Sequence, residues 1–462
     1  MRLSHARRAV SVRFDDPNLV SCAGLGAVLT LAARCGLGGL VTERVRVAAK
    51  GGANAAAKIV ALVAGMVAGA DSISDMGLLR HGGMGRLFDE IRAPSTLGTL
   101  LRLFTFGHVR QLDAVAAGFL TRLVAATPLL SGVGKVAFVD VDDTVRATYG
   151  YAKQGAGRGY TGVNGLNALL ATLSTPLSAP VIAGTRLRRG AVNSVRGAAR
   201  LLADALACAR RAGATGLVIV RADSAFYGYD IVAATRRAGA RFSLTARLTP
   251  AVTRAITSID DAAWIPIRYP HAIYDHDEQR WVSDTEVAEV AFTAFTGRRA
   301  AEHITARLIV RRVRRLNPTH IPTGQSELFA VYRYHAVFTD NPEPMLDAEA
   351  THRDHAIVEQ LIADLKDSAL AHLPSAHFNA NAAWLVCAAI AHNLTRAAGS
   401  LASSFHARAR TATIRTQLIN TPARLAHSAH RLVLHLPRDW PWEPALDELF
   451  AHALYDPVRA VA

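Results

Sequence analysis

Apolar residues recur every three or four positions through the first part of the chain, up to about residue 130. This spacing is typical of amphipathic helices and predicts helices over residues 54–70, 97–106 and 112–126. Glycine-rich or polar segments separate these stretches and are expected to end each helix. We therefore predict a helical N-terminal region over residues 1–130.

The pattern changes near Lys135, where short β-branched runs begin to alternate with helical stretches. Such runs, bounded by turn residues, are typical of buried strands. The predicted elements are strands over 136–141, 217–221 and 241–246, and helices over 198–211 and 229–238. Strands that alternate with helices indicate a mixed α/β sheet, which we assign to residues 131–248.

Residues 249–346 carry mainly the period of strands, with proline and glycine between them, and predict a β-rich segment. One predicted strand, over 304–316, holds five arginines: Arg307, Arg311, Arg312, Arg314 and Arg315. This arginine strand is either a solvated face or a groove for a phosphate backbone. Helical spacing returns over 347–400, and residues 401–462, rich in arginine and histidine, predict a helical basic tail.

Composition adds a strong positive charge to this picture. The chain of 462 residues has 52 Lys+Arg against 37 Asp+Glu, a formal net charge of +15. With 50% hydrophobic and 19% charged residues, it can bury large cores, which excludes an acidic disordered chain. Most of its cations are arginines, which bind phosphate in a bidentate manner, although a GC-rich genome would also favour arginine. A basic globular chain indicates an anionic polymer as partner, most commonly nucleic acid.

Cysteine spacing and the length of the apolar stretches bear on the compartment. Four scattered cysteines without a CxxC pair argue against a disulfide scaffold and a thiolate zinc site, and favour a reducing cytoplasm. The longest apolar stretch, 19–33, is shorter than the roughly 20 residues that a spanning helix needs. We expect no membrane span and a cytoplasmic location.

Acidic residues accompany two of the predicted strands. In FVDVDDT, residues 138–144, the period of a strand places Asp140 and Asp142 on one face and Asp143 on the other. Asp223 follows the apolar strand 217–221, at the end where open α/β sheets place ligands. Carboxylate oxygens are the ligands that Mg²⁺ prefers. For each acid alone, a capped turn or helix N-terminus is the alternative.

A third set of polar residues lies on the predicted helix over 352–366. His352, His355, Glu359 and Lys366 recur at helical spacing and share one face. The alternative is an ordinary amphipathic helix with a polar outer face. A second alternative is a transition-metal site at His352 and His355, although their spacing is a weak signature and no cysteine accompanies them.

Three segments carry a resemblance to a known family. FVDVDDTVRATYGYAKQGAGRGY, VRADSAFYG and VEQLIADLKDSALAHLPSAHFNANAAWL resemble, in order, the catalytic blocks of bacterial insertion-sequence transposases of the DDE type, specifically the insertion-sequence 1380 branch. The similarity covers about residues 130–400. It implies an RNase H-like mixed sheet with flanking helices, a β-rich insertion before the glutamate helix, and a helical N-terminal domain.

The resemblance also implies roles for single residues. Asp142, Asp223 and Glu359 match the catalytic acids, with Asp143 as the competitor for the first position. These four carboxylates are the implied ligands of two Mg²⁺ ions, with Mn²⁺ as a substitute. Lys366 would contact a DNA phosphate. The broader pattern has Tyr and Arg seven and four residues before the glutamate, where this chain has His352 and His355.

The implied activity is that of a DNA transposase. It would bind the ends of an insertion sequence, cleave phosphodiester bonds by two-metal hydrolysis, and join the freed 3′-OH to target DNA by cut-and-paste. The resemblance implies double-stranded DNA as partner, a homodimer in the DNA complex, and a nucleoid-associated location. The arginine strand would follow the DNA backbone, and Trp264 and Trp281 would stack on an unpaired base or, alternatively, pack in a core. The competing functions are a catalytically inactive DNA-binding derivative and a nuclease of the same fold that does not join strands.

Overall fold

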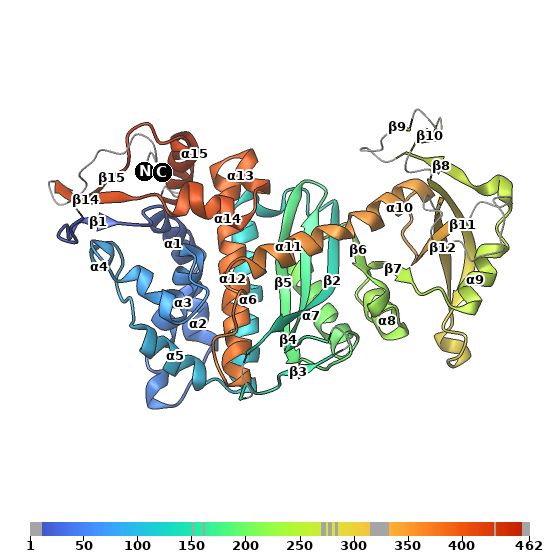
Figure 1. Ribbon diagram of the computed structural model, residues 1–462, viewed down its shortest axis with the longest axis horizontal. Helices are drawn as coiled ribbons and strands as arrows, with labels where there is room; N and C mark the ends of the chain where they lie inside the picture. The colour runs from blue at the N-terminus through green and yellow to red at the C-terminus, as the bar shows by residue number, and fades with distance from the viewer. Residues whose placement is uncertain are drawn as a thin grey trace.

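The computed structural model describes residues 12–149, 152–159, 162–268, 274–275, 280–281, 285–314, 332–428 and 431–454. Figure 1 shows helices from both ends of the chain on one side, a sheet in the middle, and the strands of residues 249–346 on the far side. The sheet and its flanking helices make this a mixed α/β fold, as the alternating pattern predicts.

The N-terminal helices form where apolar residues recur at helical spacing. The elements are α1 (Leu25–Arg34), α2 (Leu37–Arg44), α3 (Ala55–Ala68), α4 (Met84–Leu87), α5 (Pro94–Arg102) and α6 (Phe106–Ala126). Thr105 caps α6 by accepting a hydrogen bond from the His108 backbone N–H. The three helices predicted in this region are thus confirmed, with α6 starting six residues earlier than its apolar pattern indicates.

One mixed sheet forms the middle of the molecule. Its strands are β2 (Val136–Ala147), β3 (Gly157–Arg158), β4 (Asn164–Thr175), β5 (Ser178–Arg189), β6 (Leu217–Ala222) and β7 (Arg241–Ala246). Strands β2, β6 and β7 are parallel neighbours, because helices α7 (Ala198–Arg211) and α8 (Tyr229–Arg237) cross between them. Strand β4 pairs antiparallel with both β2 and β5.

The strands of residues 249–346 continue this sheet. Its strands are β8 (Ile265–Ile267), β11 (Thr285–Ala294), β12 (Ile304–Arg314) and β13 (Tyr332–Thr339). Strand β13 pairs antiparallel with β7, so the order runs β4, β2, β6, β7, β13, β12, β11, β8. The short pair β9 (Tyr274–Asp275) and β10 (Arg280–Trp281) is separate, and α9 (Pro250–Thr257) packs near β11.

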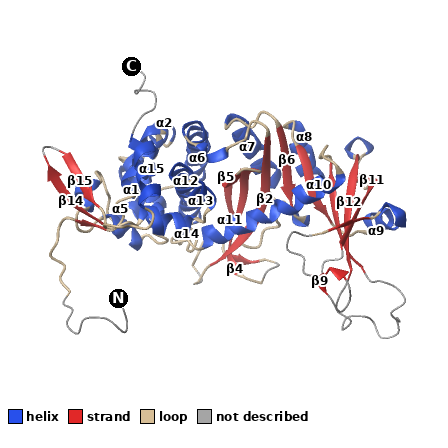
Figure 2. Ribbon diagram, turned by 90° about the horizontal axis from the view of Figure 1, so that it is seen from above, coloured by secondary structure: helices blue, strands red, loops and turns tan. Residues whose placement is uncertain are grey.

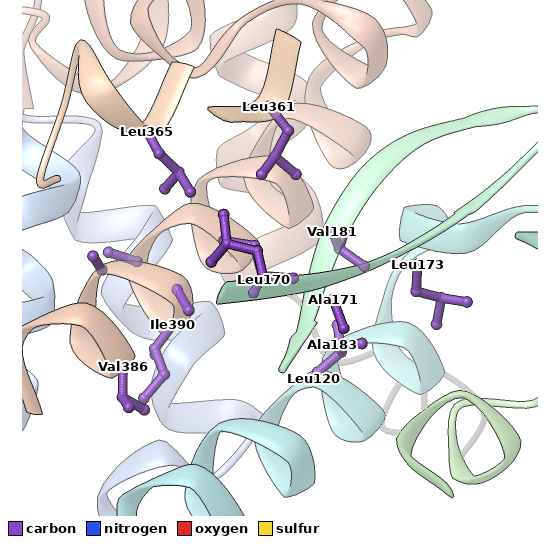
Figure 3. Packing of buried hydrophobic residues seen from close by; sticks show 14 of the residues in the cluster. Leu120, Leu170, Ala171, Leu173, Val181, Ala183, Leu361, Leu365, Val386 and Ile390 are labelled. Atoms are coloured by element: carbon purple, nitrogen blue, oxygen red, sulfur yellow. The ribbon is translucent and has the colours of Figure 1, made fainter. Parts of the chain in front are cut away.

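Helices cover both faces of the central strands. Figure 2 shows α7 and α8 on one face, with α10 (Met345–Arg353) and α11 (Ile357–Lys366) on the other. Helix α11 crosses the sheet on an apolar face, and Figure 3 shows Leu361 and Leu365 pointing toward Leu170 of β4. This packing fixes which side of α11 faces solvent.

Helix α12 (Phe378–Ala402) joins the sheet to the N-terminal helices. It is buried along most of its length and contacts α3, α5, α6 and β5. Asn393 accepts from the Ile182 backbone N–H and donates to the Ile182 carbonyl, both at 2.8 Å. The Trp384 side chain is fully buried and donates to the Ala369 carbonyl at 2.7 Å.

The C-terminal part differs from the helical tail that the sequence predicts. It holds α13 (Ser404–Arg408), α14 (Thr411–Ile414) and α15 (Glu443–Leu454), but also strands β14 (Ala423–Ser428) and β15 (Arg431–His435). Strand β14 pairs with β1 (Leu19–Val20), so the two ends of the chain share a small sheet. A pairing partner some 400 residues away in sequence leaves no local signal.

Among the described residues, no single helix combines the length and apolar composition of a membrane span. Helices α1 and α2 meet that test only as a pair bent by 51°.

Candidate active site

Two aspartates come side by side where the carboxyl end of β6 lies against the middle of the parallel strand β2. The β2–β6 register pairs Asp140 with Arg221 and Val141 with Ala222. Asp142 and Asp223 are the next residues on the two strands, and adjacent strands lie about 5 Å apart. The parallel pairing therefore brings together two of the acids that the sequence singles out.

Strand β2 extends beyond the predicted run and sends its acids to opposite faces. The sequence predicts a strand over 136–141 followed by acids, whereas β2 continues to Ala147 with the acids inside it. Asp143 faces α7, where it accepts from Asn167 Nδ2 at 3.0 Å and forms an ion pair with Arg188. Both partners of the ion pair are more than 90% buried. Asp143 is thus already neutralised by the protein, whereas Asp142 is not.

A buried ion pair lies directly beneath the two aspartates. Arg221 donates through Nε to Asp140 Oδ1 at 2.7 Å and through Nη2 to Asp140 Oδ2 at 2.9 Å. Its Nη1 donates to the Thr351 carbonyl of α10 at 2.6 Å. His355 Nδ1 lies 2.9 Å from Asp140 Oδ1. This cluster ties β2 and β6 to the segment that leads into α11.

The cluster sets the charge of Asp140. Burial would raise the pKa of its carboxyl, but Arg221 and His355 outweigh burial and hold that pKa at about 2. Asp140 is therefore ionised, and both its oxygens already bond to Arg221 or His355. This carboxylate is not available to bind a metal.

Asp142 and Asp223 have the opposite electrostatics. Partial burial, together with the charges of Asp223 and Asp143, raises the pKa of Asp142 to about 6. Asp223 lies in contact with solvent, yet loss of hydration also raises its pKa, with the charge of Asp143 adding to this effect. Among the described residues, neither carboxylate bonds to a cationic side chain; Asp142 accepts from the backbone N–H of Asp143 and Asp223 from that of Ala225. The two carboxylates repel each other when both are ionised, and a bound cation would offset this repulsion.

Helix α11 carries the third predicted acid, Glu359. The hydrogen bonds of His355 to Asp140 and of Arg146 Nε to the Ala371 carbonyl (2.7 Å) fix the chain on either side of α11. Glu359 is exposed and makes no hydrogen bond within the described residues. Burial and, secondarily, the charge of Arg146 lower the pKa of Lys366, and the charge of Asp142 opposes them.

The donor set fits a hard divalent cation in part. Two repelling carboxylates without a cationic partner provide the oxygen ligands that Mg²⁺ takes in proteins. In the described part of the chain, however, no three Asp, Glu, His or Cys side chains are grouped closely enough to hold an ion. The structure thus joins Asp142 and Asp223, and Glu359 stays a prediction.

The structure argues against a transition-metal site at His352 and His355. The two ring nitrogens of His352 lie 2.9 Å from the hydroxyls of Ser243 and Thr245, so neither is free to bind a metal. Burial lowers the pKa of His352 to about 3, which keeps the ring neutral. The buried His352 side chain therefore connects α10 to β7 through hydrogen bonds.

The arginine strand is largely neutralised by glutamates. In β12, Arg307 Nη2 lies 2.6 Å from a Glu289 carboxylate oxygen, and Arg312 Nε donates to Glu286 at 2.5 Å. Arg311 Nη1 lies 3.5 Å from Glu349. The neighbouring strand and α10 therefore occupy guanidinium groups that the sequence offers to phosphate. The Arg314 side chain and Arg315 lie outside the described residues.

Of the two tryptophans proposed to stack on a base, only Trp264 has a side chain that the structure describes. Trp264 is 8% exposed and packs in the core beneath the Arg312 guanidinium, 4.2 Å from its ring centre. This supports core packing rather than stacking on a base. The Trp281 side chain lies outside the described residues.

Sequence reasoning overlooked the two arginines that distinguish the acids. Arg188 pairs with Asp143 and Arg221 with Asp140. Arg221 gives a signal, since a charged residue inside an apolar strand requires a buried partner. Arg188 gives none, because its partner is set by the β2–β4 and β4–β5 registers together.

Comparison with protein families gives one match over nearly the whole chain. The family model described as Transposase DDE domain group 1 matches residues 3–454, nearly the whole chain. A search of curated proteins finds no match.

Proposed function

Because the chain belongs to the DDE transposases of group 1, we propose that it moves an insertion sequence by cut-and-paste. It binds the element's ends, hydrolyses phosphodiester bonds there, and joins the freed 3′-OH to target DNA. The observation that carries this proposal is the pair Asp142 and Asp223, adjacent on parallel strands and without a cationic partner among the described residues. The mixed sheet with helices on both faces is compatible with an RNase H-like core, and we assign the chain to the insertion-sequence 1380 branch.

In this proposal Asp142, Asp223 and Glu359 hold two Mg²⁺ ions, or Mn²⁺ in their place. When bound, such ions activate the attacking oxygen and stabilise the leaving oxygen of an in-line displacement. Asp142 is favoured over Asp143 as the first acid, because Asp143 is ion-paired with Arg188 on the other face.

The chain's own residues position the reaction. The Asp140–Arg221–His355 cluster holds the middle of β2 and the end of β6 against the segment that leads into α11. Lys366 provides a positive charge near Asp142 that suits a DNA phosphate. Partial burial of Asp142 keeps water from screening the charges there.

The remaining assignments complete the proposal. Residues 1–130 bind DNA, 131–248 and 347–400 form the two parts of the catalytic core, 249–346 are the insertion, and 401–462 are a basic tail. We expect a homodimer in the DNA complex and a nucleoid-associated location in the cytoplasm, as the net charge of +15 favours contact with DNA.

The experiment uses a plasmid that carries the gene with its native flanking DNA, incubated with the purified protein and Mg²⁺. We expect cleavage at the element's ends and, with a target plasmid present, covalent joining of the 3′ ends. Cleavage without joining would identify a nuclease of this fold, and DNA binding without cleavage would identify an inactive derivative. Either result would contradict the proposal.

A further inference from the structure

A cleft beside Asp223 carries four arginines on the face of the sheet opposite α11. It has a volume of about 650 Å³ and lies among the segment that leads into α7, the start of α8, and the end of the β11–β12 hairpin. The cations that line it are Arg196, Arg200, Arg247 and Arg298, against a single acid, Asp230. We propose that this arginine cleft binds the phosphate backbone of the DNA strand that continues from the cleavage site.

Two hydrogen-bond networks connect the cleft to the acids. Arg247 Nε donates to the carbonyl of Ser224, the residue after Asp223, at 2.9 Å. On the other wall, Arg188, the partner of Asp143, donates to the carbonyls of Ser194 and Arg196 at 2.7 and 2.9 Å. The two walls of the cleft are therefore tied to the residue that follows Asp223 and to the arginine that pairs with Asp143.

Two of the four arginines in the cleft form ion pairs with described acidic residues, and two do not. Arg200 and Arg298 pair with Asp204 and Glu302, at 3.5 and 2.7 Å. Arg196 and Arg247 are exposed, and neither forms an ion pair with a described residue. This contrasts with the arginines of β12, whose guanidinium groups are taken up by glutamates.

Backbone groups add to this charge. Helices α7 and α8 both begin at the cleft, after Gly197 and Gly228, and neither N-terminus has a side-chain cap. Uncapped N–H groups at a helix start attract anions and suit a phosphate oxygen. Their contribution supplements the arginines.

This inference rests on the proposed function, so its test measures DNA binding without metal. The probe is a fluorescent 40-base-pair duplex of arbitrary sequence in EDTA, titrated at several salt concentrations, since phosphate contacts are independent of sequence. The double variant Arg196→Ala/Arg247→Ala should bind about tenfold more weakly, with the slope of log K against log salt reduced by about 2. The control is Arg237→Ala, an exposed arginine at the far end of α8 whose side chain forms no hydrogen bond or ion pair with a described residue.

The outcomes separate the two proposals. If the wild type does not bind DNA, the proposed function fails together with the cleft. If the wild type binds and the double variant matches Arg237→Ala, only the cleft is overturned. Equal melting temperatures for the three proteins would show that the loss is not one of folding.

A second measurement leaves the arginines in place. The four native cysteines are buried, so a single exposed cysteine can be labelled selectively. Val195→Cys, in the cleft at a position 41% exposed, should crosslink to the duplex when it carries a benzophenone. Leu177→Cys, 60% exposed at the β4–β5 turn, is the control. Crosslinking from position 177 but not from position 195 would overturn the proposal that the arginine cleft binds DNA.

Discussion

Asp142 and Asp143 are neighbours in sequence with opposite surroundings. Asp142 lies next to Asp223 with a pKa raised to about 6 by burial and like charge, whereas Asp143 neutralises the buried Arg188. A carboxylate destabilised by its surroundings is typical of functional sites, and a paired one is typical of structural ion pairs. The two residues should therefore respond to the same substitution in opposite ways.

Asp142→Asn should stabilise the metal-free protein and Asp143→Asn should destabilise it. Loss of the ionised Asp142 carboxyl should add about 2 kcal/mol to the free energy of unfolding at pH 7.5, from its pKa shift. Loss of Asp143 leaves Arg188 buried without its partner and should cost about 3 kcal/mol. Denaturant unfolding in EDTA measures both. A lower stability for Asp142→Asn than for Asp143→Asn would contradict the assignment of the first acid.

The raised pKa of Asp142 also predicts a pH dependence. Below about pH 6 its carboxyl is protonated in the folded protein and is a poor metal ligand, so cleavage with Mg²⁺ should fall as the pH drops through 6. Since metal competes with the proton, tenfold more Mg²⁺ should move this fall to lower pH. A flat cleavage profile between pH 5 and 7 would contradict the prediction.

The sign of the stability effect follows from proton binding. Between its ordinary value of 3.8 and about 6, the folded protein binds a proton at Asp142 more tightly than the unfolded chain does. The stability that this proton contributes is complete below pH 3.8 and is lost as the pH rises to about 6. The difference in unfolding free energy between wild type and Asp142→Asn should shrink as the pH is lowered from 7 to 4.

At the scale of the element, α11 carries two acids with different roles. Glu359 is exposed and makes no hydrogen bond with a described residue. Asp364, on the same helix, is buried and accepts from the Thr411 backbone N–H at 3.0 Å and its hydroxyl at 2.8 Å. The helix thus presents one acid to solvent and uses the other to hold α14.

Glu359→Gln should abolish cleavage and change the free energy of unfolding by less than about 0.5 kcal/mol, as is usual at an exposed position. Asp364→Asn is the matched change and should cost about 2 kcal/mol through its lost charge-assisted hydrogen bonds. Plasmid cleavage and thermal unfolding of both variants check this. Normal cleavage by Glu359→Gln would remove it from the site.

At the scale of the whole molecule, α12 couples the N-terminal helices to the sheet. It contacts α3, α5 and α6 on one side and β5 on the other, with Val386 and Ile390 in the packed interior that Figure 3 shows. A shared buried helix should make these two parts unfold together.

Trp384→Ala should lower the free energy of unfolding by about 3–5 kcal/mol, because it empties a fully buried site and leaves the Ala369 carbonyl unpaired. Calorimetry should still show a single transition. Phe405→Ala, at a position 60% exposed on α13, is the control and should change little. Two separate transitions in the Trp384 variant would show that α12 does not couple the two parts.

The sequence by itself determined the local elements. Helices α7 and α8 and strands β6 and β7 lie within one residue of their predicted ranges, because hydrophobic period and turn residues are local properties. It also placed Asp140 and Asp142 on the face opposite Asp143, since side chains alternate along any strand. The net charge and the order of the acids along the chain also follow from the sequence alone.

Only the tertiary structure decided what each charged residue does. The β2–β6 register sets Arg221 against Asp140 and Asp142 beside Asp223. The β2–β4 and β4–β5 registers together bring Arg188 to Asp143. In the same way, the β11–β12 register brings glutamates to the arginines of β12, and strand β14 pairs with β1. Such partners lie tens to hundreds of residues apart, and the free energy that selects them comes from burial and long-range register, which no local pattern records.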